Sequence, residues 1–226
     1  MKQWEVIGRT RTTDGTELTL TRHPTEYVIK ADGRPLMSSL MHYSEEALAT
    51  IGCDHARGLP RPCVLVGGLG MGFTLRAALD CLPKKAEVLV AELLPAVVEW
   101  NRGPLGTLAG HPLGDPRVRV AEGDVAVTLR SSPGRFDAVL LDVDNGPAGL
   151  TAASNDGLYD ARGVAVIRAS LRPGGTLAVW SANDDPAFER RLRAKGLSVR
   201  REHVRGGPAG SGPRHTVIVA RLVGAE

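Results

Sequence analysis

The sequence has few of the features that mark a secreted, membrane-bound or metal-binding protein. Its 226 residues include three cysteines, Cys53, Cys63 and Cys81, which are too few and too widely spaced for a disulfide framework or a CxxC metal site. No apolar run approaches the roughly 18 residues of a membrane span. The first residues, MKQWEVIGRTRT, contain no apolar segment typical of a signal peptide. We therefore expect a cytoplasmic protein that binds neither a metal nor a membrane.

An excess of one charge is also absent. The 28 Lys and Arg residues nearly balance the 25 Asp and Glu residues, and the net charge of +3 gives little reason to expect a nucleic-acid partner. The arginine-rich stretches 190–193 and 200–205 are predicted to be a solvated helix face and an edge strand. A hydrophobic fraction of 42% is ordinary for a soluble globular protein and excludes a disordered chain.

The first forty residues predict a small antiparallel β unit. Segments 4–7, 17–21 and 26–30 alternate polar and apolar residues, with Asp-Gly turn signals beside them. A helix is expected to follow, with Ser44 as its N-cap. We predict an N-terminal β-strand domain over residues 1–42 and a larger domain over residues 43–226.

From Pro62 onward, continuous apolar runs alternate with helical segments. This alternation is typical of an α/β fold with a doubly wound sheet. The runs predicted to be buried strands are 63–66, 87–91, 118–120, 138–141 and 176–179, and the helical segments are 74–82, 96–101, 125–129 and 163–171. Segments 197–199 and 216–220, joined by a Gly/Pro-rich loop, are expected to pair antiparallel at one sheet edge.

The glycine-rich segment GGLGMG falls where the first buried strand is predicted to end and a helix to begin. Its glycines are Gly67, Gly68, Gly70 and Gly72. Glycines there allow positive φ angles and let a ligand touch the backbone, although a tight strand–helix turn needs them equally. Their position at the first strand–helix junction favours nucleotide binding.

Acidic residues follow at the next two strand ends. Glu92 closes the second strand and can accept two hydrogen bonds from the vicinal hydroxyls of a ribose, the alternative being a solvated carboxylate. Asp124 follows the third strand and can accept a hydrogen bond from an adenine amino group, although an Asp there is also a common helix N-cap. Together with the glycine turn, these residues predict an adenosine ligand.

The glycine spacing separates two classes of such ligands. The pattern is G-x-G-x-G, whereas dinucleotide-binding proteins have G-x-G-x-x-G, and no second mononucleotide-binding half is evident. The order of features resembles class I S-adenosylmethionine-dependent transferases, whose Rossmann-like fold binds a sulfonium ligand that carries no phosphate.

The fourth strand ends in two carboxylates, Asp142 and Asp144. Both project to the same side if the chain stays extended, because side chains alternate along a strand. Beside an adenosine crevice they would form a negative pocket. The alternative is that one caps the next helix and the other is solvated.

At this strand end the chain resembles the spermidine/spermine synthase family, the polyamine aminopropyltransferases. The family motifs are G-G-G-D-G-G, a V-E-I-D strand end, G-D-x-x-x-x-L, D-S-S-D-P-x-G-P-A, F-Y and L-x-P-G-G. The matching residues are Gly67-Gly68 with Gly70 and Gly72, Glu92, Gly123-Asp124 with Leu129, Asp142 with Gly146-Pro147-Ala148, Leu158-Tyr159, and Leu171-Arg172-Pro173-Gly174-Gly175. The resemblance covers residues 4–200.

The resemblance implies a role for each matching residue. Glu92 would bind the ribose of decarboxylated S-adenosylmethionine and Asp124 its adenine, while the glycine turn would pack against the nucleoside. Asp142 would accept a proton from the attacking amine, a small amine being the second substrate. Asp144, Tyr43 and Tyr159 are expected to bind substrate. A homodimer is expected, as in the family.

The chain also departs from the family pattern. The glycine-motif Asp that holds the donor's amino group is Gly70 here, the family's gate Tyr is replaced at best by Tyr43, and a strand-end Gln is Trp180. An Asp at position 70 would also repel the carboxylate of intact S-adenosylmethionine, so Gly70 weakens that discrimination. Three hypotheses stay open: an aminopropyltransferase, a methyltransferase that uses intact S-adenosylmethionine, and a nucleoside-binding relative without catalysis.

Overall fold

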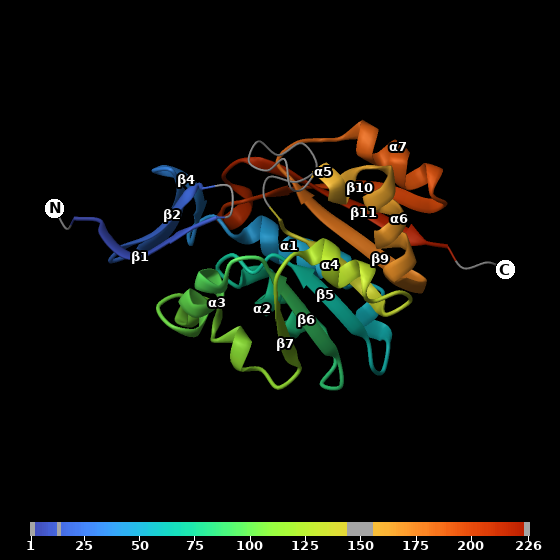
Figure 1. Cartoon of the computed structure of the whole chain (residues 1–226), viewed down its shortest axis with the longest axis horizontal. Coiled ribbons are helices and arrows are strands. Elements are labelled where there is room, and N and C mark those ends of the chain that lie inside the picture. Colours follow the sequence, from blue (N-terminus) through green and yellow to red (C-terminus); the bar gives the residue numbers. More distant parts are fainter. Residues whose placement is uncertain (1–2, 13–14, 144–155, 224–226) are drawn as a thin grey trace.

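The computed structural model describes residues 3–12, 15–143 and 156–223, and these form two sheets (Figure 1). One is a four-stranded antiparallel sheet near the N-terminus, and the other is a seven-stranded mixed sheet with helices on both faces. In the described part of the chain, no helix combines the length and the apolar character needed to span a bilayer.

The small sheet has one strand more than the sequence pattern predicts. Its strands, in spatial order, are β1 (Glu5–Arg11), β2 (Glu17–His23), β3 (Glu26–Ala31) and β4 (Arg34–Ser38). Strand β4 contains Pro35, which pairs with Lys30 where the register between β3 and β4 shifts. Because proline cannot donate a ladder hydrogen bond, it is confined to edge strands and irregular positions, and this obscured the strand in the sequence.

Helix α1 (Tyr43–Gly52) follows, and the prediction that Ser44 is its N-cap is wrong. The N-cap residue is His42, whose carbonyl accepts hydrogen bonds from the N–H groups of Glu45 and Glu46 at 3.1 and 3.2 Å. Ser44 lies inside the first turn, where its hydroxyl donates a 2.6 Å hydrogen bond to Oε2 of Glu45. The helix therefore begins earlier than expected, and the hydroxyl binds a neighbouring carboxylate.

The large sheet confirms the predicted doubly wound arrangement. Its strands are β5 (Cys63–Gly67), β6 (Glu87–Glu92), β7 (Val118–Glu122), β8 (Phe136–Leu141), β9 (Leu171–Ser181), β10 (Leu197–Arg205) and β11 (Arg214–Leu222). The spatial order is β10-β11-β9-β8-β5-β6-β7, with β5 to β9 parallel and β10 and β11 an antiparallel pair at one edge. The strand order reverses between β5 and β8, and ligands of such sheets bind at the carboxyl ends beside this switch point.

Helices cover both faces of this sheet. They are α2 (Phe73–Cys81), α3 (Pro95–Arg102), α4 (Val125–Arg130), α5 (Asp156–Tyr159), α6 (Ala161–Ser170) and α7 (Pro186–Ala194), with short 3-10 turns at Ala56–Gly58, Gly106–Ala109, Pro112–Gly114 and Pro208–Gly210. Alternate residues of β5 enter two separate apolar cores: Val64 and Val66 pack with residues of α1, α2 and α3, and Leu65 packs with residues of α4, α6 and α7. Period-two alternation explains this division.

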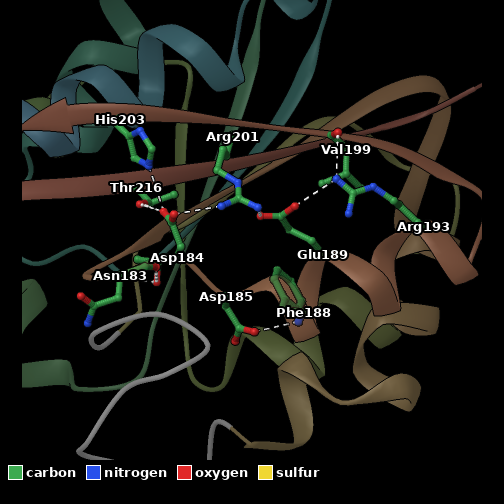
Figure 2. Close-up of polar contacts among 11 residues, drawn as sticks. Asn183, Asp184, Asp185, Phe188, Glu189, Arg193, Val199, Arg201, His203 and Thr216 are labelled. Atoms are coloured by element: carbon green, nitrogen blue, oxygen red, sulfur yellow. Dashed lines mark hydrogen bonds and ion pairs between the residues drawn. The ribbon is translucent and has the colours of Figure 1, made fainter.

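A polar cluster fixes α7 against the antiparallel edge (Figure 2). Asp184, just before α7, accepts a 2.7 Å hydrogen bond from the Thr216 hydroxyl and lies 2.9 Å from both an Arg201 nitrogen and Nε2 of His203. These partners, led by Thr216 and His203, hold the pKa of Asp184 well below its usual range. Arg201 also contacts Glu189 of α7 at 2.8 Å. The cluster therefore joins one helix to two neighbouring strands.

Candidate functional site

The glycine turn after β5 has the backbone conformation that only glycine adopts easily. Gly68, Gly70 and Gly72 have φ angles of 90°, 52° and 86°. A Cβ atom on Gly68 would lie 2.3 Å from the backbone oxygen of Asp142. The N–H of Asp142 in turn donates a 2.8 Å hydrogen bond to the carbonyl of Gly67. Glycine is thus required for the close contact between the turn and the end of β8.

Glu92 ends β6 beside this turn. Its side chain is buried, with Oε2 accepting a 2.8 Å hydrogen bond from the N–H of Leu69 and Oε1 a 2.9 Å bond from the N–H of Leu94. Two backbone donors therefore fix the carboxylate against the glycine turn. Each carboxylate oxygen can accept more than one hydrogen bond, so Glu92 keeps the capacity to bind a ribose hydroxyl.

Asp124 follows β7 and is exposed at the start of α4. Its carboxylate accepts a 2.7 Å hydrogen bond from the N–H of Ala126, which makes it the N-cap of that helix. This is the alternative that the sequence pattern left open. The residue still lies at the third successive strand end, so its expected contact with adenine stays a prediction.

Asp142 lies directly after β8, on the face of the sheet that α1 and α2 cover. The hydroxyl of Thr74, in the first turn of α2, donates a 2.6 Å hydrogen bond to its Oδ2. Burial raises the pKa of Asp142 to about 6, and the bond from Thr74 opposes that rise. A carboxyl group with this pKa can change its protonation state near neutral pH, as a general base must.

Glu45, which the sequence analysis did not single out, is the neighbour of Asp142. Burial and the charge of Asp142, in that order, raise the pKa of Glu45 to about 7. The backbone carbonyl of Glu45 lies 3.4 Å from the Thr74 hydroxyl that binds Asp142. The two carboxyl groups therefore interact, and both residues are half-buried. In the sequence, the Ser-Glu-Glu segment indicated only the start of a helix. The sequence pattern could not place Glu45 near Asp142, because that depends on the packing of α1 against α2.

Aromatic rings lie beside this pair. The ring of His42 stacks between those of Phe73 and Tyr43, at centroid distances of 4.0 and 4.7 Å. Tyr43 is 40% exposed and is the first residue of α1, the helix that carries Glu45. Its role in substrate binding stays a prediction.

Tyr159 and Asp144 are the other two predicted substrate-binding residues. Tyr159 is buried in the apolar core on the other face of the sheet, where its ring meets that of Phe188 edge-on at 5.4 Å. The structure therefore gives the ring of Tyr159 a packing role, and its role in substrate binding stays a prediction. Asp144 lies outside the described residues.

Gly70, where the family motif has an Asp, faces the small sheet. A Cβ atom at this position would lie 3.4 Å from Sδ of Met37 in β4, and the Asn101 side chain donates a 2.8 Å hydrogen bond to the Gly70 carbonyl. Asn101 is 1% exposed, and its role in holding the turn was missed because its position in α3 predicted only a cap or core residue. An apolar side chain thus lies where the motif predicts a carboxylate.

No group of three or more His, Cys, Asp or Glu side chains comes together as a metal site in residues 3–12, 15–143 and 156–223. Trp180 lies on β9, one residue past the Leu141–Val179 pair, at the level of Asp142. Its ring contacts that of His215 at 4.6 Å. An indole therefore stands at the strand end where the family has a Gln.

The chain is similar to two bacterial enzymes over most of its length. It is 34% identical over 198 residues to polyamine aminopropyltransferase 2 of Streptomyces coelicolor, covering 81% of this chain and 35% of that protein. It is 30% identical over 171 residues to the polyamine aminopropyltransferase of Mycobacterium tuberculosis, covering 72% of this chain and 31% of that protein. The chain thus spans about a third of the length of these relatives. No family model matches.

Solved structures share the fold. A spermidine synthase from Thermotoga maritima superposes with a TM-score of 0.71 and 20% identity, covering 96% of this chain and 72% of that one. A spermidine synthase in complex with the transition state analogue AdoDATO gives a TM-score of 0.70 at 19% identity, with the same coverage. These similarities confirm the predicted class I methyltransferase-like Rossmann sheet preceded by a small antiparallel β sheet.

Proposed function

We propose that this chain, which belongs to the polyamine aminopropyltransferase family as a divergent member, transfers an aminopropyl group from decarboxylated S-adenosylmethionine to a small amine. The observation that carries the proposal is the position of Asp142. This carboxyl group lies at the switch point of the sheet, is held by Thr74, and has a pKa of about 6. A base is therefore positioned beside the turn that would receive the nucleoside.

The nucleoside would lie along the carboxyl ends of β5, β6 and β7. The glycine turn lets a ligand approach its backbone closely, and Glu92 presents a fixed carboxylate to the ribose. Asp124 stands at the next strand end, where the adenine amino group is expected. This placement directs the sulfonium and its aminopropyl chain toward Asp142, at the next strand across the switch point.

The reaction needs a free amine at the sulfonium carbon. An alkylammonium has a pKa near 10, so an amine bound near neutral pH must lose a proton before its lone pair can attack. Asp142 in its carboxylate form accepts that proton. The new C–N bond forms as the C–S bond breaks, and the sulfur keeps the bonding electrons. The products are an aminopropylated amine and methylthioadenosine.

A methyltransferase using intact S-adenosylmethionine is the second candidate. The replacement of the motif Asp by Gly70 favours it, because no carboxylate at that place repels the carboxylate of the intact donor. The relatives named above do not support it.

Product analysis tests the proposal. The purified protein is incubated with each donor and a series of aliphatic diamines, and mass spectrometry follows methylthioadenosine, aminopropylated amine and methylated amine. We expect the first two from the decarboxylated donor only, and a loss of at least 100-fold in Asp142→Asn. Methylated product from the intact donor would move the chain to the methyltransferases, and unchanged turnover in Asp142→Asn would remove the base from the mechanism.

Three further predictions belong to this proposal. We propose a role in polyamine biosynthesis, a homodimer and a cytoplasmic location, and we keep the division into units 1–42 and 43–226. The family resemblance supports the homodimer, which light scattering of the purified protein tests directly. Limited proteolysis tests the division, since cleavage should concentrate near residue 42 if the two units fold separately.

A further inference from the structure

Glu45 and Asp142 form an interacting pair of half-buried acidic groups. The Thr74 hydroxyl donates a hydrogen bond to Oδ2 of Asp142 and lies 3.4 Å from the backbone carbonyl of Glu45, and the charge of Asp142 raises the pKa of Glu45. Two neighbouring basic side chains contact other carboxylates: Nδ1 of His42 lies 2.8 Å from Glu46, and Arg76 lies 2.6 Å from Asp80.

Among the residues that the structure describes, no Lys, Arg or His forms an ion pair with either carboxyl group of this pair. Buried carboxylates that lack a positive partner are costly, and a bound cation relieves that cost. The arrangement therefore suits a ligand that brings its own positive charge to Glu45 and Asp142.

The neighbouring glycine turn supplies no carboxylate for such a ligand. The motif Asp is Gly70 here, and the adjacent side chain is the thioether of Met37. The donor of the proposed reaction nevertheless carries an ammonium at the end of its aminopropyl chain. That ammonium needs an anionic partner in the site.

We infer that Glu45 supplies the carboxylate that is missing at Gly70. Together with Asp142 it forms a subsite that binds the alkylammonium of the donor and disfavours a donor that carries a carboxylate at the same end. This inference rests on the proposed function and deepens it, since it names the residue that selects decarboxylated over intact S-adenosylmethionine. Glu45 acts by differential binding: attraction to one donor and repulsion of the other.

The test compares the affinities of both donors by calorimetric titration in wild type, Glu45→Gln and Glu46→Gln. Glutamine keeps the size of the side chain and removes its charge. Glu46 is the matched control because it lies next to Glu45 on α1, but its side chain is 42% exposed and contacts His42. We expect Glu45→Gln to lower the preference for the decarboxylated donor by about tenfold or more, and Glu46→Gln to change it less than twofold.

A second variant keeps the test independent of folding defects. In the Glu45→Gln background, Gly70→Asp places a carboxylate at the motif position, where φ is 52° and the nearest side-chain atom is 3.4 Å from the new Cβ. Asp tolerates this left-handed conformation better than most residues. We expect the double variant to regain the preference of the wild type.

The outcomes separate the two claims. If wild type prefers the decarboxylated donor and Glu45→Gln keeps that preference, the inference about Glu45 is wrong and the proposed function stands. If wild type prefers the intact donor, or binds neither, the proposed function fails and this inference with it. A preference lost in Glu45→Gln and restored by Gly70→Asp supports both.

Discussion

The hydroxyl of Thr74 donates a 2.6 Å hydrogen bond to Oδ2 of Asp142 and thereby connects the first turn of α2 to the end of β8. This bond stabilises the charged form of a carboxyl group that burial would otherwise keep neutral. Thr74 is 2% exposed, so the bond forms away from solvent, where hydrogen bonds to charged groups are strong. The ionisation of the proposed base therefore depends on a side chain from a different element.

Replacing Thr74 should shift the pH dependence of the reaction. In Thr74→Val the Asp142 carboxylate loses its donor, so its pKa rises and less of it is ionised at pH 7. We expect the pKa that the ascending limb of the plot of kcat/KM against pH reports to rise by about one unit. Thr50→Val is the control, because the Thr50 hydroxyl donates a hydrogen bond to the Glu46 carbonyl on the exposed side of α1. An unmoved limb in Thr74→Val would show that Asp142 is not the titrating group.

The carboxyl pair should make the protein less stable as the pH rises. The pKa values of about 6 for Asp142 and about 7 for Glu45 lie above those of the unfolded chain, so the folded state holds protons that the unfolded chain has already lost. This contribution is fully present below about pH 4, is lost as the pH rises to about 7, and is constant above.

Urea unfolding of wild type and Glu45→Gln between pH 4 and pH 8 measures this effect. We expect the variant to gain about 2 kcal/mol relative to wild type across that range, because Gln carries no charge at either end. A difference between the two proteins that does not change with pH would contradict the raised pKa of Glu45.

Position 68 should tolerate no side chain, because Gly68 lies in close contact with the backbone of Asp142. In Gly68→Ala the new Cβ would lie 2.3 Å from a backbone oxygen at a φ of 90°, so the turn and the end of β8 must separate. We expect a loss of roughly 3 kcal/mol or more in the free energy of unfolding, and loss of donor binding. Gly58→Ala is the control, since nothing lies within 4 Å of its Cβ position. Equal stability of the two variants would exclude the close contact.

The cluster around Glu189 should contribute to stability rather than to catalysis. Glu189 is 2% exposed and contacts Arg193 at 2.9 Å and Arg201 at 2.8 Å. The side chains of Arg193 and Arg201 are 50% and 36% exposed, so solvent screens both contacts and we expect a moderate loss of about 2 kcal/mol in Glu189→Ala. Glu202→Ala, which removes an exposed partner of Arg200, should cost less than about 0.5 kcal/mol. Thermal unfolding measures both, with donor affinity expected to be unchanged.

Site residues at the carboxyl ends of the parallel strands could be predicted from the sequence. Glycine turns, apolar runs and terminal carboxylates are local patterns, and a parallel sheet necessarily gathers its carboxyl ends at one edge. This is why Glu92 and Asp142 lie where the pattern placed them. The antiparallel edge pair was also predicted, because its two strands are joined by a Gly/Pro-rich loop and not by a helix.

Residues that reach the site only because two helices pack together could not be predicted in this way. Glu45 and Thr74 reach Asp142 only because α1 and α2 lie side by side on one face of the sheet, which no local pattern encodes. Tyr159 shows the converse: a matched dipeptide motif did not reveal that the aromatic ring packs into the opposite core. Similarly, Pro35 concealed β4, and with it the side chain of Met37 that faces Gly70.

Met37 and Glu45 belong to one short stretch of chain, since β4 runs directly into α1. Residues from this stretch meet the glycine turn on one side and Asp142 on the other. An exchange of the small sheet between relatives, with the junction placed after residue 42, would therefore separate the two side chains that flank the proposed donor site. We expect chimeric proteins that move β4 and α1 as one piece to keep the donor preference of the parent that supplies them.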